Sequence, residues 1–100
     1  MADVTITCTP TSTCYGVSVD PVDVDPGGSV TFNGPVGATV GFADPQAPVD
    51  RRSKTIGASG SVTFNVNPSP NSAGTYFYGV TGISCATYCG GDDRPAMQVN

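Results

Sequence analysis

The sequence contains no histidine and no tryptophan, and only 12% of its residues are charged. Serine and cysteine hydrolases usually need histidine as the general base, so their mechanism is excluded here. Eight acidic residues outnumber four basic ones, and three of the basic residues cluster at Arg51, Arg52 and Lys54. A nucleic-acid-binding surface is normally broad and basic, so we expect no nucleic-acid partner, and we interpret the cluster as a solvated loop. We predict that the protein is not an enzyme.

Long apolar runs are also missing, and none approaches the roughly 18 residues that a membrane span needs. We therefore expect no membrane insertion. Polar Asp3 arrives almost at once, which predicts that no secretory leader stands before the first strand. Met1 and Ala2 fit an expression start added to a mature domain.

Four cysteines are present, and their spacing favours disulfides. Cys8 and Cys14 lie near one end of the chain, and Cys85 and Cys89 lie near the other. Zinc sites use closer cysteine pairs, commonly joined by histidine, so a metal site is disfavoured. Two disulfides predict an oxidising, extracytoplasmic compartment: periplasm, cell surface or exterior. The spacing alone leaves three pairings open.

Alternation of apolar and polar residues dominates the chain and predicts an all-β fold. Gly (13) and Pro (9) are plentiful, as expected for many turns, and 100 residues suit one domain, 1–100. We predict seven to eight strands in a β-sandwich, in two mainly antiparallel sheets. The segments 43–57 and 82–95 lack this alternation. We expect a long loop or a short helix at 43–57 and a polar loop at 82–95. The predicted core is Val30, Phe32, Val40, Phe42, Val62, Phe64, Tyr76, Tyr78 and Val80.

Two stretches together resemble a cupredoxin, the plastocyanin-type fold. The first, Val19–Asn33, has a proline (Pro21), a short alternating strand, the Pro26-Gly27 turn and a Val-x-Phe strand. The second, Gly74-Thr75-Tyr76-Phe77-Tyr78, is similar to that family's glycine-threonine-tyrosine strand. The resemblance covers about residues 17 to 100 and implies a Greek-key sandwich.

The copper ligands of that family are missing from this sequence. A type 1 site needs two imidazoles and a thiolate, with a weak axial ligand such as methionine. The resemblance assigns the first histidine to Ala38 or Thr39 and the cysteine to Val80. Met97 falls within the final predicted strand, where core packing explains it better. We therefore expect no copper and no other cofactor.

The resemblance also bears on the cysteines, because in a cupredoxin the first strand ends near the loop that follows the tyrosine strand. It implies that Cys8 and Cys14 lie near Cys85 and Cys89. We therefore favour disulfides that join the two ends of the chain, although local pairs remain open.

The predicted function is a non-catalytic extracytoplasmic binding or adhesion module. Its partner would be a protein or a glycan, held through exposed aromatic side chains in the disulfide-anchored loop. A purely structural spacer or packing domain is the alternative, and a small redox protein using Cys85 and Cys89 is the third hypothesis. The predicted contact surface is Tyr88, Tyr15, Asp92, Asp93 and Arg94.

Three further groups are given ordinary explanations. Phe77 is expected to pack on the outer face of its strand, beneath the 43–57 segment. Asp92 and Asp93 are adjacent, so we expect solvated carboxylates and not an acid–base pair. Asp20, Asp23 and Asp25 lack the spacing of a recognised calcium loop.

Overall fold

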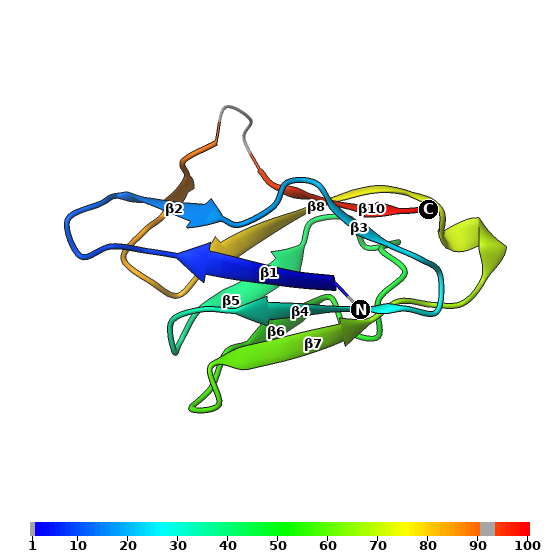
Figure 1. The fold of residues 1–100 in the computed structure, drawn as a ribbon, viewed down its shortest axis with the longest axis horizontal. Helices are drawn as coiled ribbons and strands as arrows, with labels where there is room; N and C mark the ends of the chain where they lie inside the picture. The colour runs from blue at the N-terminus through cyan, green and yellow to red at the C-terminus, as the bar shows by residue number, and fades with distance from the viewer. Residues whose placement is uncertain (1, 91–93) are drawn as a thin grey trace.

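A computed structural model describes residues 2–90 and 94–100 of this chain. It contains two mixed sheets of five strands each, which pack face to face as a β-sandwich (Figure 1). In spatial order the first sheet is β7 (Ser61–Asn65), β4 (Ser29–Asn33), β1 (Ala2–Thr7), β2 (Cys14–Val17) and β9 (Thr87–Tyr88). The second is β3 (Val22–Val24), β10 (Ala96–Val99), β8 (Gly74–Thr81), β5 (Thr39–Phe42) and β6 (Ser53–Thr55).

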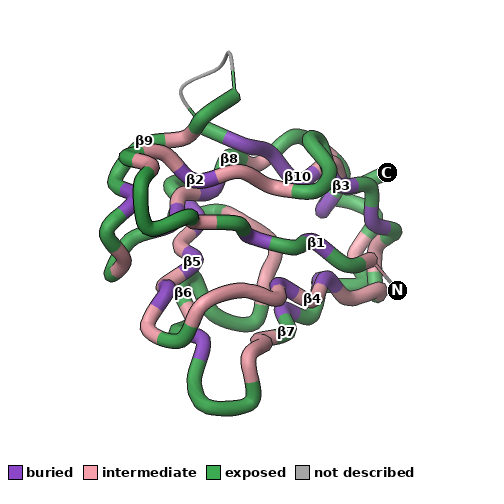
Figure 2. Tube along the Cα trace, turned by 60° about the vertical axis from the view of Figure 1, so that its left-hand side comes forward, coloured by how far each residue is buried: buried purple, intermediate pink, exposed green. Residues whose placement is uncertain are grey.

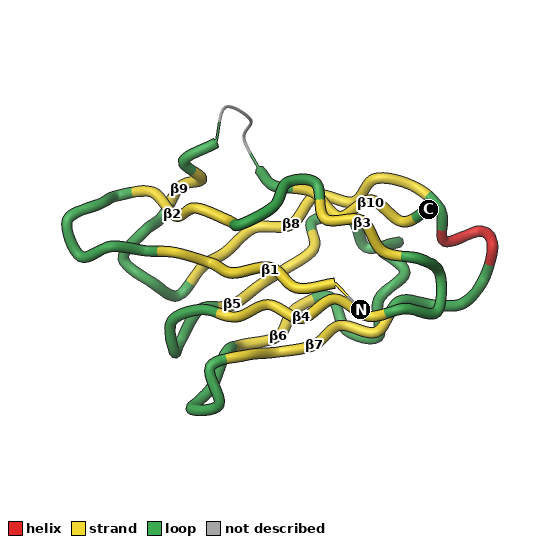
Figure 3. Tube along the Cα trace, viewed as in Figure 1, coloured by secondary structure: helices red, strands yellow, loops and turns green. Residues whose placement is uncertain are grey.

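The all-β prediction is therefore confirmed, while the strand count was too low. Ten strands lie among the described residues, and the two that sequence reasoning missed, β6 and β9, have only three and two residues. Both lie in segments where no strand was expected, and β6 shows that 43–57 is neither wholly a loop nor a short helix (Figure 3). A 3-10 helix, η1 (Pro70–Ser72), is the only helix in the described ranges, and it is far too short to cross a membrane.

Parallel and antiparallel pairings occur in both sheets. Five of the eight pairings between described strands are antiparallel, so the prediction of mainly antiparallel sheets holds. The parallel ones join β1 to β4, β10 to β3 and β2 to β9. The connections after β1 and β8 lie at one end of the molecule, opposite both chain termini (Figure 1). We call this end the disulfide pole, because it carries all four cysteines.

The core lies between the sheets, and buried positions recur along their strands (Figure 2). Phe64 is fully buried and packs edge-on against Phe32 and Phe42, at centroid distances of 5.6 and 5.2 Å. Of the nine predicted core residues, Val62 and Tyr76 are only partly buried. Val62 is on the edge strand β7, and Tyr76 directs its hydroxyl to the carbonyl of Ser72 at the rim of the sandwich.

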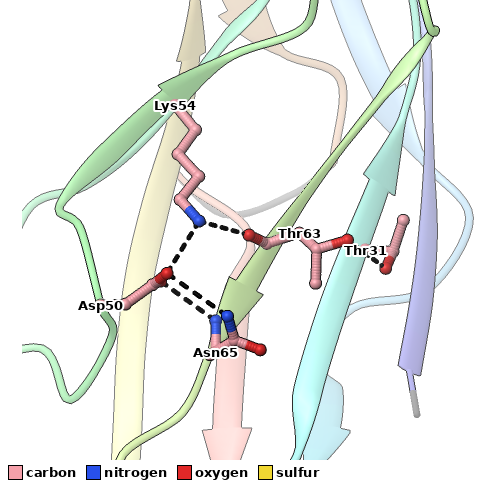
Figure 4. Close-up of polar contacts among 5 residues, drawn as sticks. All are labelled: Thr31, Asp50, Lys54, Thr63 and Asn65. Carbon is pink, nitrogen blue, oxygen red and sulfur yellow. Dashed lines mark hydrogen bonds and ion pairs between the residues drawn. The ribbon is translucent and has the colours of Figure 1, made fainter.

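A polar network covers the outer edge of β7, as Figure 4 shows. Lys54 Nζ from β6 donates to Asp50 Oδ2 at 2.9 Å and also to the Thr63 carbonyl on β7. Asp50 Oδ1 accepts from the Asn65 amide at 3.1 Å, and the Asp50 amide donates to the Asn65 carbonyl. An uncovered strand edge invites pairing with other chains. This network occupies the edge and links the two sheets on that side.

The first prediction concerns the core. Phe64→Ala removes a fully buried ring and should lower the free energy of unfolding by about 3–5 kcal/mol. The matched control is Phe77→Ala, because Phe77 is 50% exposed, and a cost below about 1 kcal/mol is expected. Urea unfolding followed by circular dichroism measures both. Equal costs for the two variants would contradict the assigned inward face.

The second prediction concerns the Asp50 network. Burial alone would raise the pKa of Asp50, but hydrogen bonds from Lys54 and Asn65 outweigh it and lower the pKa. The resulting stability is present above the unfolded pKa of about 3.9 and is lost as the pH falls through the lower folded value. Asp50→Asn should therefore be less stable than wild type at pH 7, and the difference should shrink toward pH 2.

Urea unfolding at pH 7, 4 and 2 measures this difference. Asp3→Asn removes an exposed carboxylate on β1 and controls for the change in net charge. If both variants show the same pH dependence relative to wild type, the network contributes no pH-dependent stability.

Candidate functional site

Two disulfides close the disulfide pole. Cys8 bonds to Cys85 with a Cα–Cα distance of 5.9 Å, and Cys14 bonds to Cys89 at 5.0 Å. The favoured cross-linking of the two chain ends is confirmed, and local pairs are excluded. Cys85 and Cys89 therefore have different partners and are not bonded to each other.

Near the disulfides, backbone hydrogen bonds hold the segment after β8 against the start of β2. The Ala86 amide donates to the Thr13 carbonyl at 3.0 Å, and the Cys89 amide donates to the Tyr15 carbonyl at 2.8 Å. Tyr15 and Tyr88 are register partners in the parallel β2–β9 pair. Covalent and backbone bonds together fix this segment on the edge of the first sheet.

The two tyrosines of the predicted contact surface are placed differently. Tyr15 is only 3% exposed, so the expectation that it faces outward was wrong. It belongs to the buried core, and its ring packs against Tyr88, its register partner on β9, at a centroid distance of 5.6 Å. Tyr88 is partly buried, and its hydroxyl donates to Asp20 Oδ2 at 2.8 Å. Asp20 Oδ1 accepts a hydrogen bond from the Ala96 amide at 3.0 Å. The Asp20 carboxylate therefore helps to hold both Tyr88 and the start of β10 in place.

A cleft of about 590 Å³ lies beside these tyrosines. Its floor includes Gly41 of β5 and Gly79 of β8, which are register partners on the outer face of the second sheet. Tyr88 and Thr87 of β9, in the disulfide-anchored segment, also line the cleft. A Cβ added at Gly79 would meet no atom within 4 Å, so the space above the floor is open.

Arg94 brings the only charge among the described residues that line the cleft. Burial raises the pKa of Tyr15, while a hydrogen bond with the Val80 backbone and the positive charge of Arg94 act in the opposite direction. The positive charge of Arg94 therefore acts on Tyr15 across the cleft lining. The other predicted contact residues, Asp92 and Asp93, lie outside the described residues.

The glycine floor was missed by sequence reasoning. Gly41 and Gly79 each interrupt an alternating strand, in Thr39-Val40-Gly41-Phe42 and Tyr78-Gly79-Val80. A glycine inside a strand often marks a place where another group approaches closely. That signal was available, but only the β5–β8 register shows that the two glycines face each other.

Phe77 and the basic cluster Arg51, Arg52 and Lys54 lie apart from the cleft lining. Phe77 is 50% exposed, so the expectation that the 43–57 segment covers it was wrong. The segment reaches only the strand edge, where the Ala43 amide donates to the Phe77 carbonyl at 3.1 Å. Arg51 and Arg52 are exposed, whereas Lys54 belongs to the Asp50 network.

The residues at the positions that the cupredoxin resemblance assigns to copper ligands do not suit a metal. Ala38 and Val80 are buried and apolar, and Met97 lies in the core on β10. Nor do the described residues include any group of three histidine, cysteine, aspartate or glutamate side chains suited to holding a metal ion. This donor set does not fit the ligands of a type 1 copper site.

Comparison with protein-family models, with curated proteins and with solved structures finds no match for this chain.

The third prediction is that the two disulfides stabilise non-additively. Their cysteines are 77 and 75 residues apart, so the first bond formed closes a long loop and contributes roughly 4–5 kcal/mol in the chain-entropy model. Once either bond exists, the other closes a loop of only about ten residues, which corresponds to roughly 2–3 kcal/mol. Replacing either pair by alanine should therefore cost about 2–3 kcal/mol, and replacing both about 7.

Denaturant unfolding of the two paired variants and the quadruple variant tests this. The quadruple variant should lose more stability than the sum of the two paired losses. A quadruple loss equal to or below that sum would contradict the loop-closure account.

The fourth prediction concerns Tyr78, whose hydroxyl is buried and forms no hydrogen bond to any described residue. Burial raises the pKa of Tyr78 strongly, and Asp20, Tyr88 and Tyr15 shift it in the same direction. Stability that depends on neutral Tyr78 is present below the unfolded pKa of about 10 and is lost as the pH rises above it. Tyr78→Phe should thus match or exceed wild-type stability at pH 7 and should unfold at a higher alkaline pH.

Tyr76→Phe is the matched control, because the Tyr76 hydroxyl donates to the Ser72 carbonyl at 2.9 Å. It should lose about 0.5–1.5 kcal/mol at pH 7. A loss of that size in Tyr78→Phe would show that the Tyr78 hydroxyl has a partner.

Proposed function

We propose that the protein is a non-catalytic extracytoplasmic binding module that holds its ligand in the cleft beside Tyr88. The observation that carries this proposal is the position of the cleft, between a glycine floor and a segment anchored by both disulfides. Such a site loses little conformational entropy on binding, because its walls are already ordered.

Several features support binding over catalysis. Among the described residues that line the cleft there is no carboxylate, and all four cysteines are in disulfides. The chain has no histidine. What the described lining does offer is tyrosine rings, threonine hydroxyls, backbone and a guanidinium, which are groups suited to recognition.

The proposed scaffold is a copper-free, Greek-key cupredoxin-like sandwich. The Cys8–Cys85 bond supports this, because it places the end of β1 beside the segment that follows the tyrosine strand, as the resemblance implies. The disulfides also support an oxidising, extracytoplasmic location.

A purely structural packing domain is the second candidate. Phe77 favours it, because its half-exposed ring stands on β8, the central strand of the second sheet. Its neighbours on that outer face include Ala96, the register partner on β10, and Gly79. A neighbouring domain covering this face would bury Phe77.

The fifth prediction separates the two candidates by filling the cleft. Gly79→Val adds a side chain in open space, and valine suits a strand, so the fold should be retained and the cleft obstructed. Gly16→Val on β2 is the matched control, because Gly16 also has open space and is not among the residues lining the cleft. Binding to printed arrays of glycans and peptides should be lost in Gly79→Val and retained in Gly16→Val.

Circular dichroism and urea unfolding show whether both variants are folded. A structural domain instead predicts no array binding that depends on Gly79, and that result would overturn the binding module.

A further inference from the structure

We propose that the ligand of this cleft is an acidic glycan, whose sugar ring lies on the Gly41–Gly79 floor with its carboxylate at Arg94. This inference rests on the proposed function and specifies its ligand class. Four features support it: the two glycines of the floor, the hydrogen-bonded backbone around them, the fixed ring of Tyr88 and the positive charge of Arg94.

The floor suits a flat ring. Gly41 and Gly79 are paired across β5 and β8, so two facing positions of the sheet lack side chains. Beside them, Thr81 and Thr87 also line the cleft, and the Thr87 hydroxyl donates to the Thr13 carbonyl at 3.4 Å. A ligand with a flat body and many hydroxyls matches this surface better than a wholly apolar one does.

The backbone around the floor disfavours an extended peptide. Peptides that bind sheets usually add a strand to a free edge, where they gain main-chain hydrogen bonds. Here Gly41 and Gly79 lie within the β5–β8 ladder. On the same strand, the Tyr78 amide donates to the Pro95 carbonyl at 3.0 Å. A ligand on this floor must therefore be recognised through its own ring and substituents.

The aromatic wall is held in place before any ligand arrives. Tyr88 packs against Tyr15 and is bonded to Asp20, as described above. Gly90 lies so close to its ring that an added Cβ would be 2.4 Å from a ring carbon. A fixed tyrosine presents a rigid apolar surface with a polar end, which suits the mixed C–H and O–H surface of a sugar.

The positive charge of Arg94 favours an acidic ligand. The chain carries a net charge of −4, so an anion is repelled by the protein as a whole. Arg94 is exposed at the cleft, and none of the described carboxylates forms an ion pair with it. A guanidinium binds a carboxylate through two parallel hydrogen bonds. A carboxylate on the sugar is therefore the group that Arg94 would hold.

The test uses matched acidic and neutral oligosaccharides: tetragalacturonate and its methyl ester, a hyaluronan tetrasaccharide and its carboxyl-reduced form, and sialyllactose and lactose. Calorimetry should show binding to at least one acidic member and at least tenfold weaker binding to its neutral partner. Arg94→Gln should weaken the acidic complex at least tenfold, whereas Arg51→Gln, which removes an exposed arginine that does not line the cleft, should not.

Failure of this inference is distinguishable from failure of the proposed function. Binding only to neutral glycans or to array peptides, lost in Gly79→Val, would overturn the acidic-glycan inference and leave the binding module standing. An absence of any binding that depends on Gly79 would overturn both. Acidic-glycan binding that survives Arg94→Gln would overturn the role of Arg94 and with it the inference.

Discussion

The covalent joining of the two ends of the chain is the constraint on which the rest of this structure depends. Cys8–Cys85 and Cys14–Cys89 bring the segment after β8 against the start of the chain. Without the disulfides, the backbone of the two-residue strand β9 would be tied to the first sheet by only a short pairing with β2. An isolated pairing of this length is marginal in water. The disulfides therefore allow the short β9 pairing to hold Tyr88 and Thr87 beside the cleft.

The stabilising parts of the molecule and its proposed binding surface are separated along each strand. On β8 the inward Tyr78 and Val80 are buried in the core, while the outward Gly79 leaves a bare position on the opposite face. A glycine inside a strand weakens the sheet, since it packs no side chain and loses more entropy on folding. Two facing glycines are thus a cost to stability, and the proposed ligand site would account for their presence.

The alternation of apolar and polar residues predicted most of the strands and the core. Features that depend on contacts between distant segments were missed. The period-two pattern of Val30, Phe32 and Phe64 was enough to identify the strands and most of the core. Tyr15 could not be placed by such a pattern, because it belongs to the buried core and packs against Tyr88, more than seventy positions away in the chain. The short strands β6 and β9 likewise form because partner strands present free edges. The linkage of the chain ends was expected through a family resemblance, since spacing alone left three pairings open.

Amide hydrogen exchange in protein lacking both disulfides tests this account most directly. The Ala86 amide, bonded to Thr13 between the two cross-links, reports on the cleft wall, and the Phe64 amide on β7 reports on the core. If the cross-links hold the wall, protection at Ala86 should fall to the level of an open loop while Phe64 keeps protection set by global unfolding. Ala86 protection that falls only as far as that of Phe64 would show that the wall is held by the sandwich itself, and would contradict the account.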